Sequence, residues 1–305
     1  MERPTVDVVV PFKGSADSLR RVQARLAALS LRPGDSVLVV DNTPGHERDP
    51  EPGSGPVPVL HAPELPTPAF ARNRGAARGS AEWLVFFDAD AEPRRDLLDR
   101  YFDPPPEPRT GLIGGGVVDE PVPPDAPAMA RYAHLRGAMS QQDTFDFGDW
   151  GYPKSANVAC RRAAFHEVGG FREEIRAAED ADLTYRLRAA GWQVERREDA
   201  SVVHSSRATI RGFLAQQAVW GAGGAWVHRT YPGSVPLIGR RRVLSWAART
   251  TLGGLLRAAR RRDRDAALVA LFRPLEALAW EFGRLLPNER PVPDSSIWKR
   301  LGLYR

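Results

Sequence analysis

Two acidic motifs in this sequence have the composition and spacing of functional groups. Asp88-Ala89-Asp90 follows the apolar run Trp83–Phe87, and Glu179-Asp180 opens a segment with the pattern of a helix. Two carboxylates on alternate residues after a strand can hold a hard divalent cation such as Mg²⁺ or Mn²⁺, because such ions prefer oxygen ligands. Aspartates at strand ends also favour turns. The first motif alone is therefore compatible with a metal site and with a plain turn.

The second motif is equally open when it is considered alone. A carboxylate at Glu179 or Asp180 can accept the proton of an attacking hydroxyl. Together with Asp182, however, both residues also suit the first turn of a helix predicted over 179–190, where acidic side chains favour the positive end of the helix dipole. The local sequence predicts either a base or a helix-stabilising cluster.

Three further side chains are candidates for binding. His204 ends a predicted strand over 201–204, where a histidine is either a ligand or a structural residue. Trp150 lies in an irregular stretch and is predicted to stack on a sugar or on an aromatic acceptor. Trp220 is either an acceptor-binding residue or a core tryptophan.

The elements before residue 90 predict how these groups are positioned. Apolar runs predict buried strands, and helical periodicity separates them; the strands are expected at 6–10, 37–40, 57–60 and 83–87, and the helices at 16–30 and 68–80. This alternation predicts a doubly wound α/β sheet with right-handed crossovers. Ligands bind beyond the carboxyl ends of such strands, where Pro11, Asp41 and Asp88 fall.

The rest of the chain is less regular. Further strands are expected at 112–118, 157–160, 192–195 and 201–204, with an irregular segment over 119–156 and mostly helix from residue 209. We expect one domain over 1–232, with a first half over about 1–118 and a second half over about 119–232. A helical C-terminal extension is expected over 233–305.

Composition limits the class of protein. The 305 residues carry a net charge of +5 and one cysteine, Cys160, which excludes an internal disulfide and a thiolate zinc cluster. No signal-peptide pattern and no apolar run of about 18 residues occurs, so a cytoplasmic location is expected. No nucleic acid is expected as a partner. The arginine-rich segment 240–264 suits an anionic membrane surface, and equally the exposed face of a packed helical subdomain.

Six short motifs resemble one known family when they are taken in order. They are VVVPF (8–12), VVDN (39–42), ARNRGAARG (71–79), LVFFDAD (84–90), GGF (169–171) and EDADLTYRLRAAGW (179–192). Their order is similar to that of the inverting family 2 glycosyltransferases, and the similarity covers residues 6 to about 230. The resemblance implies the GT-A fold of nucleotide-diphospho-sugar transferases, a doubly wound mixed sheet flanked by helices. It implies that 1–232 is a catalytic domain, with a nucleotide-binding half over about 1–118 and an acceptor-binding half over about 119–232.

The resemblance also implies roles at the reacting centre. Asp180 would be the catalytic base, and Glu179 would orient or bind the acceptor. Asp90 would bind the metal directly, and Asp88 would contact the ribose or the water shell of the metal. His204 would reach the metal or the diphosphate, and the metal would take up charge as the diphosphate leaves.

On the donor side, the resemblance implies a nucleoside site at the first two strands. Pro11 and Phe12 would lie beside the nucleoside, and Asp41, with Asn42, would hydrogen-bond the base. Arg72 would face the nucleotide or its diphosphate, although it also suits an ordinary charge on a helix surface.

The activity implied is the transfer of one sugar, with inversion, from a UDP-, GDP- or dTDP-sugar to an acceptor hydroxyl. The segment QQAVW (216–220) partly matches the QxxRW motif of processive synthases, but Val219 replaces the arginine, which favours single addition. Two alternatives stay open: a nucleotidyltransferase that makes nucleoside-diphosphate sugars, and a non-catalytic carbohydrate-binding protein of the same fold. The segment PFKGSADS (11–18) is a poor match to the glycine-rich, lysine-containing signature of nucleotidyltransferases.

Overall fold

The chain folds into two compact units. The computed structural model describes residues 3–45, 55–123, 125–137, 139–205, 209–236 and 238–289. The first unit comprises Met1–Val118, Met139–Glu173 and Glu179–Ser205, and the second comprises Asp119–Ala138, Glu174–Ala178 and Ser206–Arg305. The division of function at residue 232 stays a prediction.

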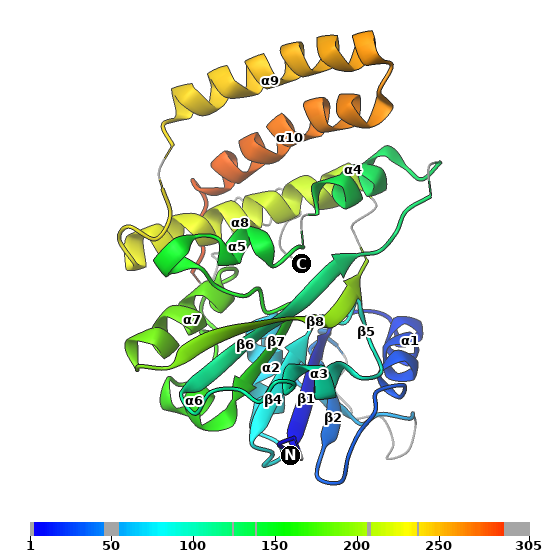
Figure 1. Ribbon diagram of the computed structural model, residues 1–305, viewed down its shortest axis with the longest axis vertical. Coiled ribbons are helices and arrows are strands. Elements are labelled where there is room, and N and C mark those ends of the chain that lie inside the picture. Colours follow the sequence, from blue (N-terminus) through cyan, green and yellow to red (C-terminus); the bar gives the residue numbers. More distant parts are fainter. Residues whose placement is uncertain are drawn as a thin grey trace. The chain divides into compact units, whose positions relative to one another are not determined.

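An eight-stranded sheet forms the first unit, in the order β3-β2-β1-β4-β7-β6-β8-β5 (Figure 1). Four strands are mutually parallel and match the predicted ones, namely β1 (Val6–Phe12), β2 (Ser36–Asp41), β3 (Val59–His61) and β4 (Trp83–Phe87). The others add antiparallel pairs, β4 with β7, β6 with β7, and β5 with β8; their bounds are β5 (Ala91–Pro93), β6 (Thr110–Asp119), β7 (Asn157–Arg161) and β8 (Gln193–His204). The sheet is therefore mixed.

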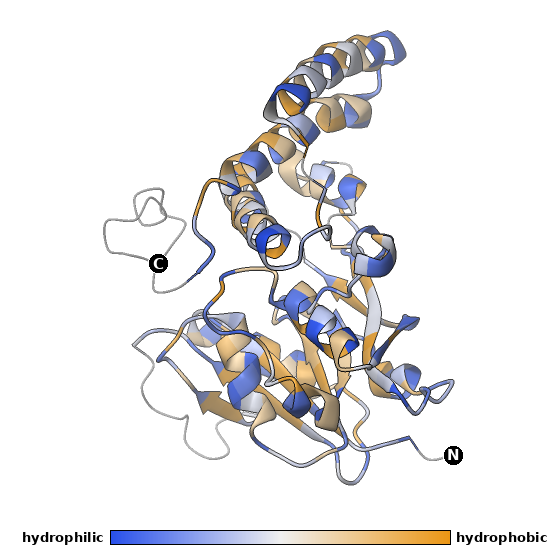
Figure 2. Ribbon diagram, turned by 90° about the vertical axis from the view of Figure 1, so that its left-hand side faces the viewer, coloured by the Kyte–Doolittle hydropathy of each residue, from blue (hydrophilic) through white to orange (hydrophobic). Residues whose placement is uncertain are grey.

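Helices cover both faces of this sheet because its strands are apolar on both sides. On β4, Val85 and Phe87 belong to one buried cluster, whereas Leu84 and Phe86 belong to the other. Apolar colours gather on the strands in Figure 2. The helices of this unit are α1 (Ala16–Leu26), α2 (Pro68–Ala76), α3 (Leu97–Tyr101), α5 (Gln142–Phe145), η1 (Gly148–Trp150), α6 (Arg162–Glu167) and α7 (Glu179–Ala189).

Side-chain caps fix where the two crossover helices begin. The Ser15 hydroxyl accepts the backbone N–H of Ser18 at the start of α1. The Thr67 hydroxyl accepts the N–H of Phe70 at the start of α2, and Pro68 occupies the first helical position. Both caps follow a strand, so the chain turns from sheet to helix within a few residues.

Two sequence predictions of local structure are wrong, and one strand is longer than predicted. The strands expected at 192–195 and 201–204 form one strand, β8, because its polar middle lies on a partly exposed face where strand pairing needs no apolar side chains. The segment 119–156 contains α4 (Ala128–Arg136), α5 and η1 and is not wholly irregular. Strand β1 continues through Pro11, since the pairing with β4 ends at Val9 and no hydrogen bond is lost there.

The second unit consists of helices, as predicted from residue 209 onward. Its helices are α4, α8 (Ile210–Thr230), α9 (Arg240–Arg261) and α10 (Arg264–Gly283). Helices α8 and α10 approach closely at Gly283, which has no side chain. A Cβ there would lie 1.9 Å from the carbonyl oxygen of Ala218. No helix among the described residues combines the length and apolar character needed to span a membrane.

Candidate active site

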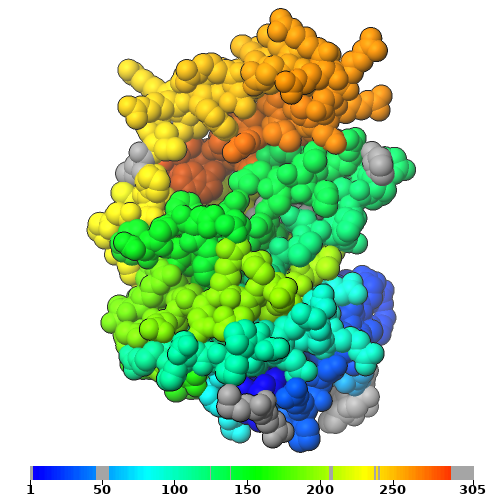
Figure 3. Space-filling model, viewed as in Figure 1, coloured from blue at the N-terminus to red at the C-terminus, as the bar shows by residue number. Residues whose placement is uncertain are grey.

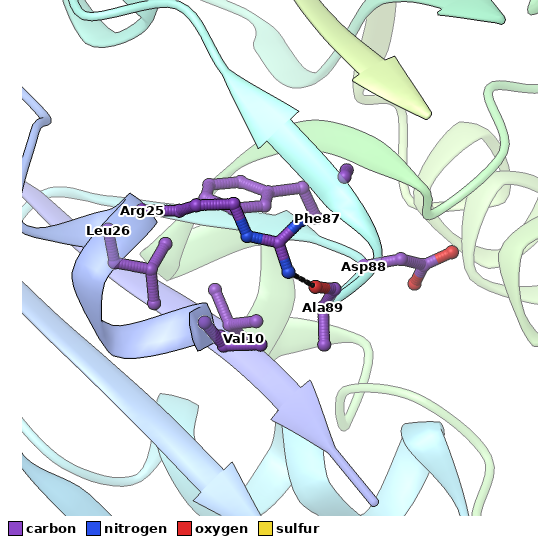
Figure 4. Close-up of a pocket in the computed structure, with 8 residues that line it drawn as sticks. Val10, Arg25, Leu26, Phe87, Asp88 and Ala89 are labelled. Atoms are coloured by element: carbon purple, nitrogen blue, oxygen red, sulfur yellow. Dashed lines mark hydrogen bonds between the residues drawn. The ribbon is translucent and has the colours of Figure 1, made fainter. Parts of the chain in front are cut away.

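A tight turn after β4 carries the first acidic motif. The N–H of Ala91 donates to the carbonyl of Asp88 at 3.0 Å, and the turn leads directly into β5. Arg25 of α1 donates to the carbonyl of Ala89 at 2.6 Å, as Figure 4 shows. Strand β5 pairs with β8 so that Ala91 lies opposite His204. The turn is therefore fixed by α1 on one side and by β8 on the other.

This pairing brings the three predicted metal ligands together. Asp88, Asp90 and His204 each offer a ligand atom, and these atoms lie within 4.8 Å of one another. The Nε2 atom of His204 lies 3.2 Å from Oδ1 of Asp90. Carboxylate oxygens with one imidazole suit Mn²⁺ or Mg²⁺. The residues present thus fit a divalent cation.

Arg72 connects the two acidic motifs. Its guanidinium is buried, with 2% of the side chain exposed, and donates to Asp88 Oδ1 at 2.7 Å and to Glu179 Oε1 at 3.2 Å. Burial raises the pKa of Asp88, while the charge of Arg72 acts in the opposite direction. Arg72 therefore holds both carboxylates in the described structure, and its predicted contact with a nucleotide stays a prediction.

Asp180 lies beside this bridge with different surroundings. Its carboxylate accepts the N–H of Ala181 at 2.8 Å and that of Ser155 at 3.4 Å. Burial and the neighbouring charge of Glu179 raise the pKa of Asp180 to about 7. A carboxylate with this pKa can exchange a proton near neutral pH, as a general base must.

The third acid of the helix has a structural role. Asp182 is fully buried on α7 and forms ion pairs with Arg172 at 2.9 Å and with Arg186 at 2.6 Å. Arg186 also donates to the carbonyls of Val168 and Gly170. Asp182 thus holds the turn after α6 against α7, and the helix-stabilising interpretation describes this residue.

The predicted nucleoside residues lie together at the ends of β1 and β2. Pro11, Phe12, Asp41 and Asn42 are all buried, and the N–H of Asn42 donates to the carbonyl of Phe12 at 2.9 Å. The side-chain amide of Asn42 donates to the carbonyl of Thr67 at 2.7 Å. That bond positions the start of α2, so Asn42 has a structural contact here, and the base-binding roles stay predictions.

The two predicted acceptor residues belong to different units. Trp150 lies in η1, and its ring meets that of Tyr185 edge-on at 5.0 Å between centroids. Trp220 lies on α8 of the second unit and is partly buried. The acceptor-binding roles of both stay predictions.

Comparison with known proteins identifies the family. The model of glycosyl transferase family 2 matches residues 7–169. A pre-mycofactocin glycosyltransferase of Mycobacterium tuberculosis is 30% identical over 239 residues, which are 76% of this chain and 50% of that protein. The chain belongs to glycosyl transferase family 2.

Two further proteins extend the comparison. The succinoglycan biosynthesis protein ExoA of Rhizobium meliloti is 28% identical over 74% of this chain and 63% of its own length. The chain thus spans about half to two thirds of the length of these two curated relatives. A mannosyltransferase of Pyrobaculum calidifontis, solved in complex with GDP-mannose and Mn²⁺, superposes with a TM-score of 0.61 at 17% identity, covering 93% of this chain and 87% of that one. The fold is of the GT-A type, as predicted.

Several contacts of this family 2 site were not predicted from the sequence. Asn73 of the ARN motif donates to the carbonyl of Phe171 at 2.8 Å and accepts its N–H at 2.9 Å, so it fixes the GGF turn. Asn157 joins three elements through Tyr101 and the carbonyls of Gly116 and Ala200. The amide of Asn157 is buried and that of Asn73 is partly buried, so both need partners, but a single asparagine gives no sequence signal of which partners it finds.

Proposed function

We propose that this protein transfers one sugar, with inversion, from a nucleoside-diphosphate sugar to an acceptor hydroxyl. The observation that carries the proposal is the buried Arg72 between Asp88 and Glu179. Arg72 links two motifs. The family resemblance implies that the first, which contains Asp88, binds the donor, and that the second, which contains Glu179, activates the acceptor. Family membership supports the proposal, and neither nucleotidyl transfer nor carbohydrate binding without catalysis is favoured by any observation.

Asp180 acts as the base in this proposal. A hydroxyl that attacks the anomeric carbon loses its proton to Asp180, and the diphosphate leaves from the opposite face of the sugar. One such displacement inverts the anomeric configuration. The N–H groups of Ala181 and Ser155 orient the carboxylate, and Arg72 holds Glu179 in place to bind the acceptor.

Asp88, Asp90 and His204 would hold a divalent cation in this enzyme. When bound, Mg²⁺ or Mn²⁺ stabilises negative charge on the departing diphosphate. The solved mannosyltransferase of similar fold contains GDP-mannose and Mn²⁺, which supports a nucleotide-sugar donor and a metal here. UDP-, GDP- and dTDP-sugars are the donors to be compared.

Helix α9 supports a further proposal, a peripheral contact with an anionic membrane. Its leucines Leu244, Leu252 and Leu256 are 58%, 67% and 62% exposed. At 3.6 residues per turn they form one stripe beside the arginines 242, 249 and 260, and α9 contains no acidic residue. Long side chains project from α9 in Figure 3.

A panel of donors tests the proposed sugar transfer. The enzyme is incubated with each donor, Mn²⁺ and an acceptor library, and products are identified by mass spectrometry and by the anomeric coupling constant in NMR. We expect transfer from one class of donor with the opposite anomeric configuration. Retained configuration, or release of pyrophosphate from a nucleoside triphosphate and a sugar phosphate, would contradict the proposal.

A further inference from the structure

A short segment before β7 follows helix α7 away from the proposed base. We call residues 149–155 the strap. At one end the N–H of Ser155 donates to Asp180 at 3.4 Å. Further along, the hydroxyl of Tyr185 donates to the carbonyl of Trp150 at 2.9 Å, and at the other end Arg188 donates to the carbonyl of Asp149, also at 2.9 Å. The strap and α7 therefore run side by side, in opposite directions, from the base to Arg188.

A cavity lies at the far end of the strap. Its volume is about 310 Å³, and it is lined by Asp149, Trp150, Tyr185 and Arg188. Arg188 is eight residues beyond Asp180, which at 1.5 Å per residue is roughly 12 Å along the helix. The Arg188 end of the cavity thus lies farther from the base along the helix than the width of one sugar ring, and the base and the cavity belong to the same helix and strap.

The charged groups of the cavity are available to a ligand. Arg188 is half-buried and donates to the backbone carbonyl of Asp149; within the described part of the chain it forms no ion pair with a carboxylate. Burial lowers the pKa of Arg188. The carboxylate of Asp149 is exposed. The carboxylate of Asp149 and the guanidinium of Arg188 together carry no net charge, which favours a neutral ligand over a charged one.

The aromatic groups of the cavity narrow the class of ligand. The half-buried indole of Trp150 is held edge-on by Tyr185, whose own hydroxyl is bonded to the strap. A fixed indole face stacks on the C–H face of a ring. Carboxylate and guanidinium groups at its rim can exchange hydrogen bonds with ring hydroxyls. Together they suit a polyhydroxylated ring, which is a sugar.

We propose that this cavity is an acceptor subsite for a neutral sugar ring remote from the hydroxyl that reacts at Asp180. This inference rests on the proposed function and adds the class of acceptor. The acceptor is an oligosaccharide or a glycoconjugate with at least one further unit between the bound ring and the reacting hydroxyl. A monosaccharide acceptor would leave the cavity unfilled.

The test compares acceptors of different length with the active donor. Methyl glycosides of the neutral hexoses and their di- and trisaccharides are used with wild-type enzyme, Trp150→Ala, Arg188→Gln and the control Phe147→Ala, whose ring is 48% exposed and outside the cavity. We expect KM of the wild-type enzyme to fall as the acceptor lengthens. Trp150→Ala should raise KM for the trisaccharide about tenfold, the loss of one stacking contact. KM for the monosaccharide and the Kd for donor should stay within twofold.

A second measurement guards against misfolding. Calorimetry of the trisaccharide with Asp180→Asn, alone and combined with Trp150→Ala, should show the same loss of affinity. Equal KM values for mono- and trisaccharides, or a trisaccharide KM unaffected by Trp150→Ala and Arg188→Gln, would overturn the subsite and leave the proposed transfer intact. Absence of transfer by the wild-type enzyme with every donor and acceptor would refute the proposed function and the subsite together.

Discussion

Replacement of Arg72 by alanine tests the buried bridge that joins the two acidic motifs. The substitution removes the bonds to Asp88 and Glu179 and leaves two poorly exposed carboxylates, 30% and 16% exposed, without their shared cation. Removal of one partner of a buried ion pair costs about 3–5 kcal/mol. For a unit of this size, at about 2–4 °C per kcal/mol, the melting temperature should fall by roughly 6–20 °C.

The same helix supplies a matched control. Arg74 is 53% exposed and lies 3.8 Å from Glu64, so Arg74→Ala should cost less than about 1 kcal/mol. Arg72→Lys keeps the charge but cannot reach both carboxylates with a planar fork, and it should fall between the two. Differential scanning calorimetry measures all three. Equal melting temperatures for Arg72→Ala and Arg74→Ala would refute the bridge.

Three further predictions concern metal, pH and lipid. Excess chelator should abolish transfer, and Mn²⁺ or Mg²⁺ should restore it. The Asp90→Ala variant should stay folded and be inactive. Full turnover in excess chelator would show that the metal has no part in the mechanism. Because Asp180 with a pKa of about 7 must be deprotonated to act, kcat/KM should rise about tenfold per pH unit below 7 and level off above it. A flat profile from pH 5 to 8 would contradict this. The protein should sediment with anionic liposomes, and less of it should do so at high salt or in the Arg242→Glu/Arg249→Glu/Arg260→Glu variant. Equal recovery with anionic and with neutral liposomes would exclude the membrane contact.

The sheet and the position of the first acidic motif at its edge were predictable because their signals are local. Continuous apolar runs such as Trp83–Phe87 indicate buried strands, and the acidic residues that follow them must lie at the carboxyl edge of a parallel sheet. His204 could be placed near Asp90 only through the family resemblance. The pairing of β5 with β8 that brings them together is long-range and leaves no mark in the sequence.

The contacts that fix the second motif were not predictable. Nothing in the sequence indicates that Arg72 bridges two carboxylates, or that Asp182 has two arginine partners while Asp180 has backbone N–H groups. Ala178, directly before Glu179, has φ of +71°, a conformation that sequence rules assign to glycine. These features depend on tertiary packing, which overrides local preference.

The most direct test of the account is the rate of Asp180→Asn. Asparagine preserves the size of the side chain, and its amide oxygen can still accept a backbone N–H as Asp180 does, but it cannot accept the proton. We predict that kcat falls by roughly 10²–10⁴-fold and that donor Kd, measured by calorimetry, stays within a few-fold of wild type. A wild-type kcat in Asp180→Asn, together with an inactive Glu179→Gln, would contradict the assignment of the base.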